Sequence, residues 1–399
     1  MNASSSNRSC LLGTGTRCSH WIEISPKAYR HNLRGLRHLL KPDVKLMAVV
    51  KANAYGHGAR LITPLAVAAG ADYLGVDSLA EFEEIRDLCE GVPVCILGPI
   101  LPSEAQAVVA SGVEPAVSSM EVALALARAA RTTNQHVRIH IKVETGTHRQ
   151  GILPEEIPDW CAFFAKYPLM RFRGLHTHFA NIEDTTDHTV ARRQLARMKE
   201  ARQVFADLGQ TPDITHSACS AATIVMEETH GDMVRLGIAS FGLWPSRETY
   251  LSTLLSHRMG PELLPVLSWK ARIAQIKGVE PGEFVGYGCT FRTTHAMRIA
   301  VLPVGYYDAY DRRLSGHGYV LASGKRAPIV GRVCMNMTMI DISDIPDPQL
   351  GQEVTLIGRH GAEVITADTL AALCGTINYE IVSRLGRHIP RMLAKEATE

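Results

Sequence analysis

The amino-acid sequence predicts an α/β protein with an N-terminal (β/α)8 barrel of the TIM type, followed by a mainly β C-terminal domain. The length of 399 residues exceeds what one ordinary hydrophobic core needs and indicates two domains. Short apolar runs alternate with helical stretches from about residue 44 to residue 246, which is typical of a parallel sheet. Beyond residue 266 the sequence contains short strand-like segments separated by Gly, Pro and Asp.

Eight apolar runs are the expected barrel strands. They cover residues 45–50, 73–76, 94–97, 114–117, 137–143, 172–177, 214–217 and 233–238. Helical patterns lie at 78–88, 119–131, 189–208 and 221–228, and Pro26 opens an earlier amphipathic helix. A doubly wound open sheet is the alternative, but no Gly-rich nucleotide fingerprint follows the first strand.

The expected domain boundaries lie where the composition and the apolar pattern of the sequence change. Residues 1–19 are polar and are interpreted as a disordered extension, because they lack the apolar core of a signal peptide. The barrel is expected over 20–255, the β domain over 256–392 and a charged tail over 393–399. The segment 21–25 alternates like a strand and is a candidate to pair with the β domain. The β strands are predicted at 267–278, 298–304, 318–321, 327–333, 338–342 and 353–357, with a final helix at 366–373.

The composition excludes several classes of partner. A net charge of +2 gives no reason to expect nucleic acid or an anionic membrane as a partner. No apolar run approaches the roughly 20 residues of a membrane-spanning helix. Nine cysteines are scattered without metal-ligand spacing, so we expect reduced thiols, no metal site and a cytoplasmic protein.

Lys51 is the most informative residue of the chain. It ends the apolar run 46–50 and is followed by the tight turn Tyr55-Gly-His-Gly. Partial desolvation at the mouth of a parallel strand penalises the ammonium form, so we expect an amine able to attack a carbonyl and hold it as a Schiff base. The alternative is an ordinary solvated lysine at a strand end.

Other polar residues occupy corresponding positions after later strands. These are Lys142 with Arg149, His178, Ser220 and Arg235. Because active sites of such barrels lie at the carboxyl ends of the strands, these residues are expected to form one site. Ser220 at a helix start and Gly237 after the last strand predict an anion pocket, with a plain helix cap as the alternative for Ser220. A lone histidine such as His178 is also compatible with a purely structural role.

Three segments resemble the alanine racemase family, which uses pyridoxal phosphate. They are Val-Val-Lys51-Ala-Asn-Ala-Tyr55-Gly-His-Gly, His216-Ser-Ala-Cys-Ser220-Ala-Ala-Thr and Arg235-Leu-Gly237-Ile238. The resemblance implies that Lys51 carries the cofactor, and that its phosphate is contacted by Tyr55, Ser220, Gly237, Ile238 and Tyr379. It also implies that Arg235 is hydrogen-bonded to the pyridine nitrogen, with His178 orienting Arg235. An arginine there cannot protonate the ring nitrogen, which makes the ring a weaker electron sink.

Racemisation requires a proton donor and acceptor on each face of the planar reacting carbon. Lys51 serves one face. The segment Gly282-Glu-Phe-Val-Gly-Tyr287-Gly-Cys-Thr resembles the family's catalytic-tyrosine strand, which implies that Tyr287 reaches the site of a partner subunit. Its phenol must lose a proton more readily than a free tyrosine, which we expect positive charge on the His178–Arg235 pair to favour. From its spacing alone, Tyr287 is equally compatible with a surface aromatic residue.

Two further segments of the same family predict substrate contacts. Gly331-Arg332-Val-Cys-Met335-Asn-Met implies that the Met335 N–H binds the substrate carboxylate, flanked by Arg149. The segment from His140 to Arg149 matches a lysine–arginine pair whose lysine, here Lys142, is carbamylated in some relatives. His176 stands where many relatives have tyrosine. Tyr306, Arg312 and Arg332 match an entrance corridor, with ordinary charged surface as the alternative.

The resemblance extends from about Trp21 to Arg391. It implies a homodimer with shared active sites that interconverts L- and D-alanine, a precursor of peptidoglycan. A broader racemase, or one for serine or lysine, is an open alternative that differs in pocket volume. A non-catalytic protein that carries the cofactor is disfavoured by the β domain and by Tyr287. A decarboxylase on the same barrel would need a different specificity helix and a catalytic cysteine, and the candidate Cys334 lies in the racemase-like segment Arg-Val-Cys-Met.

Overall fold

The computed structural model describes residues 18–256 and 260–395, so most of the predicted extension at 1–19 and of the tail at 393–399 lies outside the described residues. The chain divides into two compact units. Pro26–Val266 forms one, and the segments before and after it form the other. Within the described ranges, no helix combines the length and the apolar character needed to span a bilayer.

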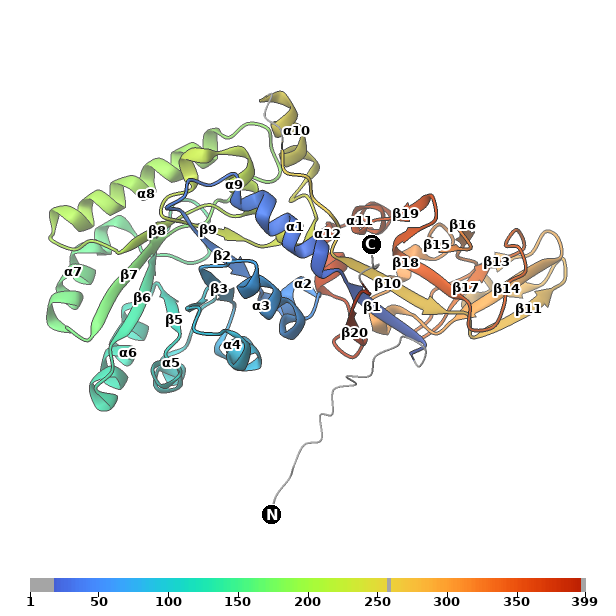
Figure 1. Ribbon diagram of the computed structural model, residues 1–399, viewed down its shortest axis with the longest axis horizontal. Coiled ribbons are helices and arrows are strands. Elements are labelled where there is room, and N and C mark those ends of the chain that lie inside the picture. The colour runs from blue at the N-terminus through green and yellow to red at the C-terminus, as the bar shows by residue number, and fades with distance from the viewer. Residues whose placement is uncertain (1–17, 257–259, 396–399) are drawn as a thin grey trace, which may run out of the picture. The chain divides into compact units, whose positions relative to one another are not determined.

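The unit Pro26–Val266 is a nearly closed barrel of parallel strands, which confirms the predicted fold class (Figure 1). Its strands are β2 (Lys45–Val49), β3 (Tyr73–Val76), β4 (Val94–Ile96), β5 (Glu114–Val117), β6 (Val137–Lys142), β7 (Met170–His176), β8 (Ile214–His216) and β9 (Met233–Leu236). Their order is β8-β7-β6-β5-β4-β3-β2-β9. At the seam between β8 and β9, Thr215 N and Oγ1 donate to Asp232 Oδ2 at 2.6 and 2.7 Å, and Asp232 N donates to Thr215 O at 2.9 Å.

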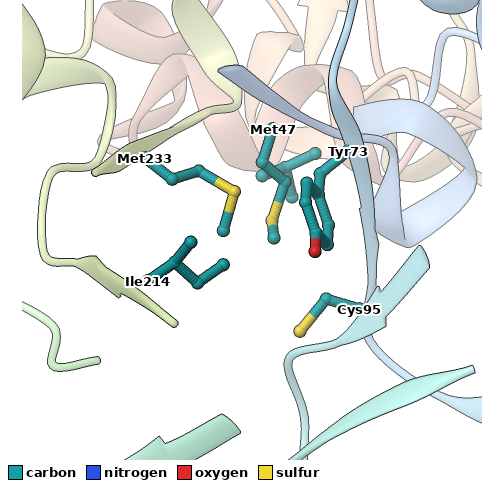
Figure 2. Packing of buried hydrophobic residues seen from close by; sticks show 6 residues of the cluster. Met47, Tyr73, Cys95, Ile214 and Met233 are labelled. Atoms are coloured by element: carbon teal, nitrogen blue, oxygen red, sulfur yellow. The ribbon is translucent and has the colours of Figure 1, made fainter. Parts of the chain in front are cut away.

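Apolar side chains fill the inside of the barrel. Met47, Tyr73, Cys95, Ile214 and Met233 project towards one another from β2, β3, β4, β8 and β9 (Figure 2). Strands such as β3 and β5 are buried along their whole length. Strands buried on both faces read as continuous apolar runs in the sequence, and for this reason the runs located them well.

Helices lie outside the barrel strands (Figure 1). They are α1 (Pro26–Arg37), α3 (Ala59–Ala68), α4 (Leu79–Ile85), α5 (Ala105–Ser111), α6 (Met120–Thr133), α7 (Ile157–Lys166), α8 (Thr189–Asp207), α9 (Ser220–Val225) and α10 (Arg247–Leu255). Ser78, Ser119 and Ser246 accept hydrogen bonds from the third residue beyond them and so cap α4, α6 and α10. The short element α2 (Lys51–Tyr55) belongs to the site and is described below.

The other unit is mainly β. Its elements are β1 (His20–Ile24), β10 (Leu267–Arg272), β11 (Gln275–Val279), β12 (Phe284–Val285), β13 (Phe291–Arg292), β14 (Met297–Leu302), β15 (Tyr319–Ala322), β16 (Lys325–Pro328), β17 (Thr338–Asp341), β18 (Glu353–His360), β19 (Glu363–Ile365), α11 (Ala367–Cys374), α12 (Asn378–Ser383) and β20 (Arg391–Leu393). The largest sheet has the order β16-β15-β18-β10-β1-β20, with β19 on β18. Smaller sheets are β11-β14-β17 and β12-β13. The early strand β1 pairs with β10 in antiparallel fashion.

Two predicted strands of this unit differ from the structure. The segment predicted over 267–278 is two strands in different sheets, because Ile273 N still donates to Gln352 O whereas Ala274 N donates to Val301 O. The segment predicted over 327–333 is strand only to Pro328, and Gly331 adopts a φ of 71° that a strand does not allow. Apolar content located both segments but not their hydrogen-bond partners.

Candidate active site

The predicted barrel residues gather at the carboxyl ends of the strands. Lys51 follows β2, Lys142 ends β6, His178 follows β7, and Ser220 opens α9 immediately beyond β8. The strand register places Lys142 beside His176, and His176 beside His216. Arg235 lies in β9, opposite Met47 of β2. One end of one barrel therefore carries an amine, a guanidinium, a hydroxyl and several imidazoles.

Lys51 follows β2, as predicted, and directly precedes a left-handed turn. Ala52, Asn53, Ala54 and Tyr55 all have φ between 52° and 55°. The left-handed conformation costs an L-residue about 1–2 kcal/mol, so this turn holds about 4–8 kcal/mol of local strain. The sequence predicted a tight turn only from Tyr55 onward, because alanine carries no preference for positive φ. Strain of this size persists only where surrounding contacts hold the backbone.

Glu81 of α4 supplies one of these contacts. Its carboxylate accepts hydrogen bonds from Ala52 N and from Asp77 N, both at 2.7 Å. Asp77 in turn forms an ion pair with Lys51, with 3.1 Å between Oδ1 and Nζ. The Lys51 side chain is 39% exposed, so its amine is more accessible than the strand-end interpretation suggested. Glu81 thus holds the backbone next to Lys51, through Ala52 N, and the backbone of Asp77 itself. The position of Glu81 in the sequence did not indicate this role.

Ser220, Gly237 and Tyr55 lie together in an arrangement that we call the Ser220 cradle. Ser220 Oγ accepts hydrogen bonds from Gly237 N at 3.0 Å and Ala239 N at 3.4 Å. A Cβ at Gly237 would lie only 2.3 Å from the Tyr55 hydroxyl, so the close approach requires glycine. Burial raises the pKa of Tyr55, which keeps the phenol a neutral hydrogen-bond donor. These groups suit a phosphate.

The Arg235 guanidinium is buried, with 6% of the residue exposed, and is held from two sides. Nη1 donates to His216 O at 2.7 Å and lies 3.0 Å from His216 Nδ1. Nη2 donates to Thr177 O at 2.9 Å and Ser217 O at 3.1 Å, and lies 3.2 Å from His178 Nδ1. These contacts use Nη1 and Nη2 and leave out Nε. Nε is therefore the donor that can serve an acceptor in the barrel mouth.

A buried chain of side chains continues behind Arg235. His216 Nε2 lies 2.9 Å from His140 Nδ1, and His140 Nε2 lies 3.0 Å from Glu114 Oε2. Because Arg235 only donates and Glu114 only accepts, each imidazole is assigned as the tautomer with hydrogen on Nε2. His140 fits because Gly174 has no side chain, since a Cβ there would lie 2.0 Å from His140 Nδ1. Sequence reasoning missed this chain, although His216 and His140 stood in the segments that it quoted.

The imidazoles around Arg235 are uncharged. Burial, followed by the charge of Arg235, lowers the pKa of His178 to about 3 and that of His176 well below its usual value. Burial also lowers the pKa of His216. His176 stacks on His216 with ring centroids 4.7 Å apart and planes 3° apart. The positive charge that was expected on the His178–Arg235 pair therefore rests on the Arg235 guanidinium alone.

These neutral imidazoles predict a steep loss of stability in acid. Below about pH 6.5 the unfolded chain protonates His176, His178 and His216 while the folded chain does not, so the unfolded state binds more protons. Each imidazole then lowers the free energy of unfolding by about 1.4 kcal/mol per pH unit, or about 4 for all three, and none does so above about pH 6.5. Urea unfolding from about pH 7 to about pH 4 measures this slope.

The control for this prediction is a pair of histidine variants. His178→Asn is expected to flatten the slope by about 1.4 kcal/mol per pH unit. His136→Asn, at an exposed position, leaves it unchanged. A free energy of unfolding that stays constant down to about pH 4 would contradict neutral buried imidazoles.

Lys142 ends β6, and Arg149 lies in the loop that follows this strand. Lys142 is buried, and its Nζ donates to Gln150 Oε1 at 3.0 Å. Burial, followed by the charge of Arg149, lowers the pKa of Lys142 to about 8. Glu144 Oε1 accepts from Gly146 N and Thr147 N at 2.5 and 2.6 Å and so holds the loop that carries the exposed Arg149. Gln150 was not among the predicted residues, and its neighbours in the sequence carry no signal for it.

The remaining predicted residues belong to the β unit. Tyr287 lies in a short 3-10 turn after β12, not in a strand, between Gly286 and Gly288, which both have positive φ. Its side chain is 74% exposed. Met335 is 55% exposed, and its carbonyl accepts from Tyr307 N at 2.9 Å. Tyr379 lies in the first turn of α12.

The comparisons with known proteins cover nearly the whole chain. The model of the alanine racemase N-terminal domain matches residues 24–245, and that of the alanine racemase C-terminal domain matches residues 266–393. Alanine racemase of Leptospira interrogans is 38% identical over 94% of this chain and 96% of its own length. That of Desulfovibrio desulfuricans is 40% identical over 93% of this chain and 97% of its own.

Solved structures agree with the sequence relatives. Alanine racemase from Bacillus anthracis with bound L-Ala-P superposes with a TM-score of 0.88 at 32% identity, over 95% of this chain and 96% of that one. Alanine racemase from Bartonella henselae with covalently bound pyridoxal phosphate superposes with a TM-score of 0.82 at 27% identity, over 94% of this chain and the full length of that one. With both domain models matched in order and relatives aligned along almost their entire length, the chain belongs to the alanine racemase family.

Proposed function

We propose that this protein interconverts L-alanine and D-alanine with pyridoxal phosphate held at the mouth of the barrel. The observation that carries the proposal is the buried Arg235 guanidinium, held so that Nε remains for a ring nitrogen, in the same barrel mouth as Lys51 and the Ser220 cradle. When bound, the cofactor withdraws electrons from the α-carbon of an attached amino acid, which makes the α-proton acidic.

Different residues are proposed to bind different parts of the cofactor. Lys51 supplies the amine for the covalent link, after leaving its ion pair with Asp77. Ser220, Tyr55 and the N–H groups near Gly237 and Ile238 hold the phosphate, and Tyr379 is assigned to the same group by the family resemblance. Arg235, fixed by His178 and His216, offers its guanidinium to the ring nitrogen without giving up a proton.

The proposed reaction uses two bases. Lys51 moves the α-proton on one face of the substrate and the Tyr287 hydroxyl moves it on the other, so a proton removed from one face is replaced from the opposite one. The Met335 N–H and the Arg149 side chain bind the substrate carboxylate. The high exposure of Tyr287 supports a role in the site of another subunit rather than in a core of its own.

The proposed assembly is a homodimer with shared active sites. Its support is a set of exposed large side chains on the β unit, in or next to the segments that the family resemblance assigns to the second base, to substrate binding and to the entrance corridor: Tyr287, Tyr306, Tyr307, Met335 and Met337. Exposed apolar and aromatic side chains in such number mark interaction surfaces. Arg312 and Arg332 are proposed to line the corridor to the site with Tyr306.

The proposed location is the cytoplasm, with D-alanine supplied for peptidoglycan. All eight cysteines of the described residues are free, which suits a reducing compartment. The test of the function is an assay of the purified protein, loaded with pyridoxal phosphate, against a panel of L-amino acids. We expect D-alanine to form faster than any other D-amino acid. D-serine or D-lysine as the main product would replace the substrate, and absence of every D-product would overturn the proposal.

Lys142 is proposed to be carbamylated. Its pKa of about 8 leaves about a tenth of the amine neutral at pH 7, and that neutral fraction can form an N–C bond to carbon dioxide with loss of one proton. The resulting anion would compensate the cation of Arg149. Native mass spectrometry in bicarbonate buffer is expected to find the added mass of one carbon dioxide, which is absent from Lys142→Ala. An unmodified mass under these conditions contradicts the proposal.

A further inference from the structure

His57 is a buried residue to which the proposed function assigns no role. Its imidazole is buried, and Nδ1 lies 3.1 Å from Ala54 O and 2.9 Å from Tyr55 O. Two carbonyl oxygens only accept hydrogen bonds, so Nδ1 is assigned as the protonated nitrogen that donates to both. Both carbonyls belong to the left-handed turn that begins beyond Lys51. The ring of His57 thus lies against the strained backbone itself.

The same ring also contacts the loop after β9, residues 237–241, which we call the phosphate loop. It stacks on Phe241 with centroids 4.3 Å apart and planes 27° apart, and the Tyr55 ring lies 5.3 Å from Phe241. Phe241 ends the 3-10 turn Ile238–Phe241, which follows Gly237. Two strand ends, β2 and β9, are therefore joined through one pair of stacked rings. A displacement of the turn would move Tyr55 away from Gly237 and the Lys51 amine away from Arg235.

We propose that His57 is a positioning residue that locks the left-handed turn Ala52–Tyr55 and so sets the Lys51 amine and the Tyr55 hydroxyl against the phosphate loop. This positioning role, which we call the lock, adds to the proposed function, and the effect of the lock on catalysis rests on that function. Glu81 holds the start of the turn through Ala52 N, and His57 holds its end. Without the donor at Nδ1, relaxation of positive φ at Ala52 and Ala54 moves the turn out of register. The Lys51 amine and the Tyr55 hydroxyl are then out of position for binding the cofactor.

The test compares two substitutions of His57. His57→Phe keeps a ring for Phe241 but has no donor, whereas His57→Asn gives up the ring and keeps an N–H near the place of Nδ1. Hydrogen–deuterium exchange of the amides in residues 52–58 is measured on the cofactor-free protein, followed by the dissociation constant of pyridoxal phosphate. His57→Phe is expected to speed exchange and weaken cofactor binding by about tenfold each, and His57→Asn by much less. Equal effects of the two variants would overturn the donor assignment.

Two further variants separate the lock from general destabilisation. Ala52→Gly removes the cost of positive φ at an exposed position, so in the His57→Phe background it is expected to restore most of the cofactor affinity. Phe205→Leu, in the buried face of α8, lowers global stability but is expected to leave exchange over 52–58 unchanged. Failure of Ala52→Gly to restore binding refutes the lock. Exchange in the cofactor-free protein does not depend on the reaction, so it tests the lock even if the proposed activity is wrong.

Discussion

Replacement of Lys51 by alanine is expected to lower racemisation of alanine by at least about 10⁴-fold, the upper end of what one positioned base contributes. The variant loses both the amine that carries the cofactor and the base on one face of the substrate. The left-handed turn survives, because Glu81 and His57 hold its backbone and not the lysine side chain. The measurement is D-alanine formation from L-alanine together with the absorption spectrum of the protein-bound cofactor.

Chemical rescue and a matched lysine provide the controls. A small primary amine such as methylamine fits the space left by the shortened side chain, so it is expected to restore part of the activity in proportion to its concentration. Lys45→Ala removes a lysine from the opposite end of the same strand, β2, and leaves activity unchanged. Full activity in Lys51→Ala, or equal losses in both variants, would contradict the role of Lys51.

Strand positions in the barrel were predictable because strands that are buried on both faces have continuous apolar sequences. The runs predicted at 73–76 and 114–117 coincide with β3 and β5, and every residue of these strands is buried. In the β unit the same signal was weaker, since alternation identifies strand residues but not the partner strand. The division of 267–278 between β10 and β11 depends on hydrogen bonds from Ile273 to Gln352 and from Ala274 to Val301, partners that lie far along the chain.

The composition of the site was more predictable than its geometry. Strand topology alone brings Lys51, Lys142 and Arg235 to one end of the barrel, whatever their individual environments. The left-handed turn was not predictable, because Ala52 and Ala54 adopt it through contacts from Glu81 and His57 and not through their own preference. The absence of charge on His178 is likewise a tertiary property, set by burial and by the neighbouring guanidinium.

Replacement of Tyr287 by phenylalanine is expected to separate the two faces of the reaction. Lys51 still removes the α-proton of one enantiomer, while the hydroxyl that serves the other enantiomer is gone. Exchange of the α-hydrogen in deuterium oxide is therefore expected to fall by about 10²–10⁴-fold for one enantiomer and far less for the other. Tyr319→Phe, at a half-buried tyrosine in β15 of the same unit, should leave both rates intact. Equal residual exchange from L- and D-alanine in Tyr287→Phe would contradict the two-base assignment.

Subunit mixing tests whether Tyr287 acts in the site of its partner. If each site combines Lys51 of one subunit with Tyr287 of the other, a mixed dimer of Lys51→Ala and Tyr287→Phe chains contains one intact site and one doubly altered site. Random mixing makes half of the dimers mixed, so the activity is expected to recover to about a quarter of the wild-type value from two nearly inactive proteins. If both residues instead served the site of their own chain, no mixture would recover activity, because every site would carry one of the two substitutions.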